Sequence, residues 1–146
     1  MKVVRLESAH LTEVARVETE CFSEPWSESS LELLLSEAAT GVVCILDGET
    51  VGYGGMLWAP DEGQITNIAV SAAWRGKGVG SAVLAELIAQ AREKRCQSIS
   101  LEVRESNASA ISLYEKYGFF VAGRRKRFYK NPSEDALVML LTLNYE

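Results

Sequence analysis

Apolar residues in the N-terminal part of the chain recur with the spacing of one strand and two helices. Residues 3–6 predict a short strand, and residues 8–22 predict a helix that ends before Pro25 and Trp26. A second helix is expected to begin at Ser27 or Ser29 and to run to Ala38. The positions expected to face inward are Leu11, Val14, Val17 and Cys21 in the first helix, and Leu31, Leu34 and Leu35 in the second.

Short extended segments follow. Residues 42–46 and 51–58 flank Asp47-Gly48, a strong hairpin signal because both turn positions need a positive φ angle. Residues 60–63 predict another turn, and residues 64–70 a third strand. This part of the chain is therefore expected to form an antiparallel meander.

The pattern of the C-terminal half alternates between helical and extended spacing. The expected elements are a helix over 78–94, a strand over 98–103, a helix over 107–117 that Gly118 ends, and strands over 119–123 and 136–143. We expect an α+β fold: a central mixed sheet with an antiparallel first half, covered by about four helices. Residues 1–146 are expected to form a single domain.

Composition narrows the class of protein. With 47% hydrophobic and 24% charged residues, the chain can bury a substantial core. No apolar run approaches the ~18 residues of a membrane span, and the polar Glu7-Ser8 follows the first strand where a signal peptide would be apolar. We therefore expect a cytoplasmic protein that does not contact a membrane.

Charge and cysteine usage exclude several kinds of site. The net charge of −5 disfavours nucleic-acid binding and suits a basic protein partner. Cys21, Cys44 and Cys96 form no CxxC pair and are expected to be buried, inert thiols. With His10 as the sole histidine, neither a metal centre nor a Ser/His/Asp triad is expected. We also expect a monomer.

Candidate chemistry concentrates in residues 65–80, where a buried strand leads into the loop Arg75-Gly76-Lys77-Gly78-Val79-Gly80 and then a helix. Glycines let a backbone approach phosphate oxygens closely, and the first turn of a helix offers free N–H groups and a positive dipole end. A tight turn that needs glycine only for its geometry is the alternative. Glycines at alternate positions together with two basic side chains favour phosphate binding.

Two common phosphate-binding motifs fit poorly. The GxxxxGK[ST] pattern of P-loop proteins is absent. A dinucleotide fold could use Gly76-x-Gly78, with Glu102 as the acid that binds ribose. However, Ser81 stands where that motif has its third glycine, and a helical and antiparallel segment precedes the loop where such a fold would begin. The dinucleotide interpretation is therefore rejected.

Arg75-x-x-Gly78-x-Gly80 resembles the [Gln/Arg]-x-x-Gly-x-[Gly/Ala] signature of the GNAT superfamily of acetyltransferases, in which this loop holds the pyrophosphate of coenzyme A. The chain departs from the commonest pattern, because Arg75 stands where glutamine is common and Gly76 where arginine is common. Five further stretches resemble the bacterial ribosomal-protein-alanine N-acetyltransferases: Pro25-Trp26-Ser27, Asn67-Ile68-Ala69-Val70, Leu101-Glu102-Val103-Arg104, Ser106-Asn107-Ala108 and Leu113-Tyr114-Glu115 followed by Gly118-Phe119.

The resemblance assigns two catalytic residues. Strand periodicity places Glu102 on the face opposite to Leu101 and Val103, where the pattern alone indicates an ordinary solvated glutamate. The resemblance implies instead that Glu102 is the general base. It also implies that Tyr114 is a general acid for the departing thiolate or stabilises it, and Tyr117 is the competing tyrosine.

Further positions are implied to bind the coenzyme. The resemblance assigns Ile68, Ala69 and Val70 to the pantetheine arm and acetyl carbonyl through backbone N–H groups. Asn107 is implied to contact the coenzyme and competes with Ser106 as helix N-cap. The residues implied to hold the pyrophosphate are Arg75, Gly76, Lys77, Gly78, Val79, Gly80 and Ser81.

The basic run from Arg124 to Arg127, with Lys130, indicates a solvated surface, and the resemblance places it in a loop near the acceptor groove. The implied activity is direct transfer of an acetyl group from acetyl-coenzyme A to a protein's terminal α-amino group, without a metal or an acetyl-enzyme. The acceptor implied is the terminal alanine of small-subunit ribosomal protein eighteen. A lysine or small-amine acetyltransferase and a non-catalytic coenzyme A sensor or ribosome scaffold remain alternatives.

Overall fold

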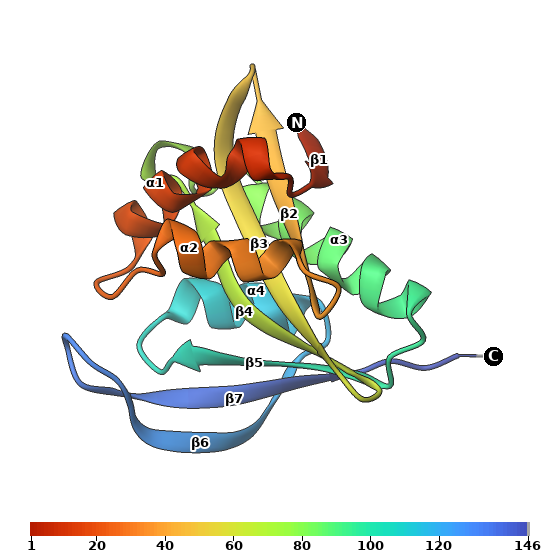
Figure 1. Ribbon diagram of the computed structural model, residues 1–146. Helices are drawn as coiled ribbons and strands as arrows, with labels where there is room; N and C mark the ends of the chain where they lie inside the picture. The colour runs from red at the N-terminus through yellow and green to blue at the C-terminus, as the bar shows by residue number, and fades with distance from the viewer. Residues whose placement is uncertain (146) are drawn as a thin grey trace.

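The computed structural model describes residues 1–145 and contains one seven-stranded sheet in the order β1-β2-β3-β4-β5-β7-β6 (Figure 1). The β4–β5 pair is parallel and every other neighbouring pair is antiparallel. The strands are β1 (Lys2–Arg5), β2 (Ala39–Leu46), β3 (Glu49–Ala59), β4 (Glu62–Val70), β5 (Ser98–Arg104), β6 (Phe120–Tyr129) and β7 (Glu134–Thr142). The predicted mixed sheet with an antiparallel first half is confirmed.

Helices cover both faces of this sheet. On one face lie α1 (Leu11–Cys21) and α2 (Glu28–Leu31), and on the other lie α3 (Val79–Glu93) and α4 (Ala108–Lys116) (Figure 1). Three 3₁₀ turns complete the helical structure: η1 (Ser8–His10), η2 (Glu32–Leu35) and η3 (Ala72–Trp74). None of the helices in residues 1–145 has the length and apolar character that a membrane crossing would require.

The sheet separates two apolar cores. One core packs α3 and α4 against the sheet, and the other packs α1 and α2 against it. From β5, the residues Ile99, Leu101 and Val103 all enter the α3–α4 core. Strand alternation therefore turns Glu102 toward the face of α1 and α2. Figure 1 shows that α1 and α2 lie over β2 to β4 and leave β5, β7 and β6 uncovered on that face.

Strands β4 and β5 separate after a short parallel contact. They pair only from Glu62 with Ser98 to Gln64 with Ser100. Immediately beyond, the register between β3 and β4 shifts: Gly55 faces Asn67 whereas Met56 faces Ile65, which leaves Thr66 as an extra residue in β4. A bulge of this kind bends its strand. The divergence leaves the edge of β4 beyond Gln64 without a neighbouring strand in the described part of the chain.

The local turn signals are confirmed. Asp47 and Gly48 form the two-residue hairpin turn, with φ angles of 51° and 78°. Asn107 is the N-cap of α4, because its side chain accepts a hydrogen bond from the N–H of Ala110 at 3.2 Å. This resolves the competition with Ser106. Gly118, with a φ angle of 98°, follows α4 as predicted.

The second predicted helix was too long. It consists of α2 and the 3₁₀ turn η2, and it ends at Leu35 rather than Ala38. Leu31 and Leu34 are buried, but Leu35 is 39% exposed, which corrects its predicted inward position. A 3₁₀ turn has three residues per turn, so positions three apart share a face and Leu35 is rotated outward.

The strand predicted over 119–123 was too short. The strand β6 runs on to Tyr129, so the basic run from Arg124 to Arg127 lies in a strand and not in a loop. Its register against β7 shifts between Arg125 and Tyr129, and Arg127 adopts a φ angle of 51°. Because this bulge lies within a strand that is exposed along nearly its whole length, no apolar alternation marked it in the sequence.

Candidate active site

A cleft of about 490 Å³ opens where β4 and β5 diverge, beside the N-terminal ends of α3 and α4. All the predicted site residues line it except Glu102 and Lys77. Those that do are Ile68, Ala69, Val70, Arg75, Gly76, Gly78, Val79, Gly80, Ser81, Asn107 and Tyr114. Ile68 of β4 and Tyr114 of α4 are 46 positions apart in the chain and line the same cleft.

The geometry of the glycine loop at the start of α3 suits an anion. Gly76 and Gly78 have φ angles of 75° and 86°, and no atom lies within 4 Å of where a side chain would begin. Glycine is therefore needed for its backbone angle and not for space. The first helical bond runs from the N–H of Ala82 to the carbonyl oxygen of Gly78, at 3.0 Å. The N–H groups of Val79 and Gly80, in the turn before it, are consequently free of helical partners and suit phosphate oxygens.

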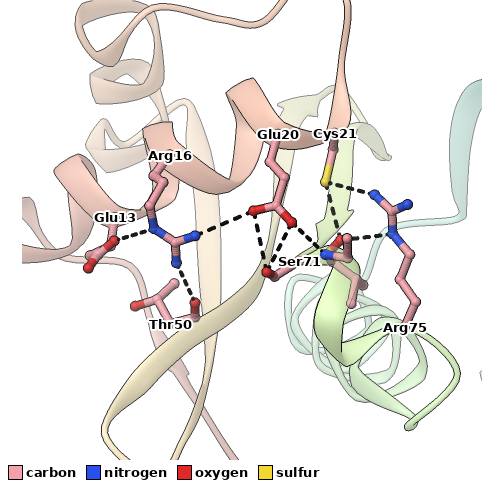
Figure 2. A network of polar contacts seen from close by, with 9 residues as sticks. Glu13, Arg16, Glu20, Cys21, Thr50, Ser71 and Arg75 are labelled. Atoms are coloured by element: carbon pink, nitrogen blue, oxygen red, sulfur yellow. Dashed lines mark hydrogen bonds and ion pairs between the residues drawn. The ribbon is translucent and has the colours of Figure 1, made fainter.

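Arg75 fastens this loop to the end of β4. Its Nε donates to the carbonyl oxygen of Val70 at 3.1 Å, and its Nη2 donates to Cys21 Sγ at 3.4 Å. The Cys21 thiol donates to the same carbonyl at 3.2 Å (Figure 2). Two nitrogens of the guanidinium thus contact protein atoms, and both Arg75 and Lys77 are exposed. Cys21 was predicted to be buried, but it is only half-buried and lines the cleft at the end of α1.

Glu20 ties α1 to the segment that leads into the loop (Figure 2). Its carboxylate accepts hydrogen bonds from the N–H of Ala72 at 2.6 Å and from the hydroxyl of Ser71 at 3.2 Å. The pKa of Glu20 is lowered, first by the Ala72 N–H and then by Ser71 and by the charges of Arg16 and Arg75. Arg16 lies 3.4 Å from Glu20 and donates to the carbonyl oxygen of Thr50 at 3.1 Å. This network holds one wall of the cleft in place.

A buried carboxylate fixes the other side of β4. Glu18 is 1% exposed and accepts hydrogen bonds from the Tyr53 hydroxyl, the Asn67 amide at 3.1 Å and the Trp26 N–H at 2.9 Å. Burial and the Glu18 charge raise the pKa of Tyr53. Because Trp26 belongs to the segment between α1 and α2, Glu18 joins that segment to β4 next to the bulge.

The two candidate tyrosines are distinguished by their contacts. Tyr114 lines the cleft, and burial, with a smaller contribution from Tyr129, raises its pKa to about 12. It is therefore a neutral hydrogen-bond donor at physiological pH. The Tyr117 hydroxyl is instead hydrogen-bonded to the side chain of Ser81. Tyr117 joins α4 to α3, and Tyr114 is the phenol that faces the cleft.

Glu102 lies on the opposite face of the sheet and not in the lining of the cleft. Its Oε1 is 3.3 Å from Nε of Arg125 in β6. Burial, followed by the charge of Glu102, raises the pKa of Tyr129 to about 12. Tyr129 therefore lies close enough to Glu102 for this charge to raise the pKa of Tyr129, and close enough to Tyr114 to raise the pKa of Tyr114. The two predicted catalytic groups thus approach the divergence of β4 and β5 from opposite faces.

Arg104, two residues after Glu102 in β5, holds the connection between β6 and β7 close to Glu102. It donates to the carbonyl oxygens of Lys130 at 2.9 Å and Pro132 at 3.0 Å, and stacks over the Tyr129 ring with its guanidinium carbon 4.6 Å from the centroid. It also pairs with Glu134 at 3.2 Å. The second carboxylate oxygen of Glu134 accepts from the N–H of Ser106 at 2.6 Å, and the bonds to Ser106 lower the pKa of Glu134.

Comparison with known proteins identifies this architecture. The sequence pattern of the Acetyltransferase (GNAT) family matches residues 11–119. The chain belongs to the GNAT family of acetyltransferases. Curated relatives include a [ribosomal protein bS18]-alanine N-acetyltransferase of Haemophilus influenzae, 34% identical over 94% of this chain and 95% of the relative. A Bacillus subtilis (strain 168) protein that carries this name provisionally is 38% identical over 97% of this chain and 93% of its own length.

Solved structures agree with this assignment. The ribosomal-protein-S18-alanine N-acetyltransferase from Escherichia coli superposes with a TM-score of 0.92 at 30% identity, covering 99% of this chain and 95% of that one. Ard1 from Thermoplasma volcanium gives a TM-score of 0.88 at 26% identity, covering 99% and 98%. The GNAT fold of this chain is thereby shown over nearly its whole length.

Several residues around the GNAT cleft were not predicted from the sequence. Cys21, Phe22 and Trp74 line it, as do Ser109 and Leu113 of α4. Their positions depend on the packing of α1 and α4 against β4, and no local motif marks them. In the part of the chain that the structure describes, no group of three or more histidine, cysteine or acidic side chains is arranged to hold a metal ion.

Proposed function

We propose that this GNAT acetyltransferase transfers the acetyl group of acetyl-coenzyme A to the N-terminal α-amino group of the alanine of ribosomal protein bS18. The relatives named for this activity match the chain almost from end to end. The proposed mechanism rests on the divergence of β4 and β5. This gap connects the cleft on one face of the sheet with Glu102 on the other face.

The coenzyme occupies the cleft beside α3 and α4. Its pyrophosphate lies at the first turn of α3, where the N–H groups after Gly78 are free and the helix dipole favours an anion. The pantetheine arm follows the unpaired edge of β4. Backbone N–H groups alternate in direction along a strand, so those of Ile68 and Val70 point to that edge, whereas that of Ala69 points to β3. The Ile68 and Val70 N–H groups stabilise the acetyl oxygen as it becomes negative. Asn107 closes this binding surface at the start of α4.

The acceptor approaches from the open face of β5. Glu102, directly or through a water, removes a proton from the α-amino group. The nitrogen lone pair then attacks the thioester carbonyl carbon, and the carbon–sulfur bond breaks as the tetrahedral intermediate collapses. A second nitrogen proton leaves with the base or solvent, and coenzyme A departs as a thiolate. Because the pKa of Tyr114 is about 12 and that of a free thiol is ~8.5, Tyr114 stabilises the thiolate by a hydrogen bond.

An acidic segment beside the open face supports a basic acceptor. The segment that contains α2 and η2, residues 22–38, includes four glutamates and no lysine or arginine. They are Glu24, Glu28, Glu32 and Glu37. This surface borders the uncovered face of the sheet on which Glu102 lies (Figure 1). An acidic border attracts a positively charged polypeptide and raises its rate of encounter.

The test is release of thiol from acetyl-coenzyme A with two matched peptides. One copies the first six residues of bS18 with a free amino terminus, and the other is blocked there and carries one lysine. Turnover with the first peptide, lost by at least about 100-fold in Glu102→Gln, supports the proposal. Turnover with the second alone indicates a lysine acetyltransferase. No turnover despite tight coenzyme binding indicates a sensor or another acceptor.

A further inference from the structure

Arg125 is the residue of the basic run that reaches Glu102. The side chain of Arg125 is 59% exposed and that of Glu102 is 32% exposed, with 3.3 Å between Nε and Oε1. Its neighbour Arg124 pairs instead with Glu105 at 2.7 Å and Asp135 at 3.3 Å. Of the basic run, Arg125 is thus the residue whose charge contacts the proposed base directly. Arg104, two residues along β5 on the same face, pairs with Glu134 instead.

The side chains of Arg125 in β6 and Glu102 in β5 meet across the strand β7, which lies between them. Glu102 faces Val138, and Val138 faces Gly123 of β6, which has no side chain. Two residues farther along β6, Arg125 faces Ala136 of β7, whose methyl group is fully buried. Residues that are opposite in neighbouring strands share a face. Two small residues therefore allow the guanidinium to lie over β7 and contact a strand that β6 does not adjoin.

Aromatic packing holds Arg125 from the other side. Its guanidinium carbon is 5.8 Å from the centroid of the Phe128 ring, within the range of a cation–π contact. The Phe128 ring in turn packs edge-on against Tyr129, with centroids 5.0 Å apart. The bulge around Arg127 brings Phe128 back toward Arg125. The charge is therefore placed by an ion pair and an aromatic ring together.

We propose that Arg125 is a selectivity-determining residue that favours α-amino acceptors over lysine side chains. The inference rests on the proposed function of Glu102 as base. The guanidinium beside Glu102 offsets the attraction of this carboxylate for a cationic acceptor. The fraction of an acceptor that arrives neutral escapes that offset. The fraction that arrives as ammonium must approach a carboxylate that is already paired and give up a proton to it before its nitrogen can attack.

The two kinds of acceptor differ widely in neutral fraction. With a reference pKa of ~7.7–8.0, about 25–40% of α-amino groups are neutral near pH 7.5, against about 0.1% of lysine side chains with a pKa of ~10.4. A site that disfavours ammonium groups therefore penalises lysine far more. Without the charge of Arg125, Glu102 attracts ammonium groups more strongly. The kcat/KM for lysine acceptors is therefore expected to rise more than that for α-amino acceptors.

The experiment compares kcat/KM for the α-amino and lysine peptides, with product detected by mass spectrometry. Arg125→Gln removes the charge, Arg125→Lys keeps it, and Lys126→Gln removes a neighbouring charge that makes no ion pair among residues 1–145. The α-amino to lysine ratio is expected to fall about fivefold in Arg125→Gln, the scale of a partly exposed ion pair. Arg125→Lys and Lys126→Gln are expected to keep the wild-type ratio.

Binding of acetyl-coenzyme A verifies that each variant is folded. An unchanged ratio in Arg125→Gln overturns the inference, as does an equal fall in Lys126→Gln or Arg125→Lys, or the absence of lysine product from every variant. The underlying function fails separately: if Glu102→Gln retains full turnover on the α-amino peptide, Glu102 is not the base, whatever the ratio in the Arg125 variants.

Discussion

The Tyr117 hydroxyl is hydrogen-bonded to the side chain of Ser81 and lies 3.3 Å from its carbonyl oxygen, which joins α4 to the first turn of α3. Tyr117 therefore supports the glycine loop at the start of α3. Tyr114, three residues earlier and within α4, faces the cleft instead. These two phenols have different partners and should respond differently to loss of the hydroxyl.

Tyr114→Phe is expected to lower kcat by about 10- to 100-fold with little change in the affinity for acetyl-coenzyme A, because the thiolate loses its hydrogen-bond donor. Tyr117→Phe is the matched control. It should weaken coenzyme binding and lower the free energy of unfolding by about 1 kcal/mol, the usual contribution of one hydrogen bond. Steady-state kinetics and coenzyme titration measure both. Equal loss of kcat in the two variants would contradict the assignment.

Gly78→Ala is expected to raise the KM for acetyl-coenzyme A at least about tenfold. A side chain at a φ angle of 86° strains the loop, and relief of that strain moves the N–H groups of the first α3 turn. Gly48→Ala is the control, since Gly48 has a φ angle of 78°, similarly open space, and a position in the β2–β3 hairpin. Both variants should lose about 1 kcal/mol of unfolding free energy. A raised KM in Gly48→Ala as well would indicate a general loss of stability.

Glu18→Ala is expected to lower the free energy of unfolding by about 3 kcal/mol or more, because it leaves the buried hydroxyl of Tyr53 and amide of Asn67 without their acceptor. Glu13→Ala, on the same helix with its carboxylate side chain 54% exposed, should change it by less than about 1 kcal/mol. Urea titration at neutral pH measures both. Similar values for the two variants would show that the buried cluster contributes no special stability.

Acid should destabilise the fold through carboxylates such as Glu20 and Glu134. Their folded pKa values are lowered, so they bind protons more weakly in the folded state than in the unfolded state. The stability that they contribute is full above the unfolded pKa of about 4.3 and is lost as pH falls from there through the lower folded pKa. Urea unfolding between neutral and acidic pH should show this loss, and Glu20→Gln should show a shallower one. The opposite slope would contradict the shifts.

The sequence predicted best the features that depend on residues adjacent in the chain. The hairpin at Asp47-Gly48 and the glycine loop before α3 follow from backbone angles that few residue types adopt, so both were predicted. The proposed role of Tyr114 came from resemblance and not from pattern. The bulge of β6 and the contact of Arg125 with Glu102 could not be predicted, because each depends on register between strands far apart in the chain.

The position of the transferred acetyl group tests the central claim most directly. The protein would be incubated with acetyl-coenzyme A and intact, unacetylated bS18, and each modified nitrogen located by mass spectrometry of the digested acceptor. The account predicts stoichiometric acetylation of the α-nitrogen of the terminal alanine by the wild-type protein and almost none by Glu102→Gln. Acetyl groups on lysine side chains alone, or an unmodified terminus despite bound coenzyme, would contradict it.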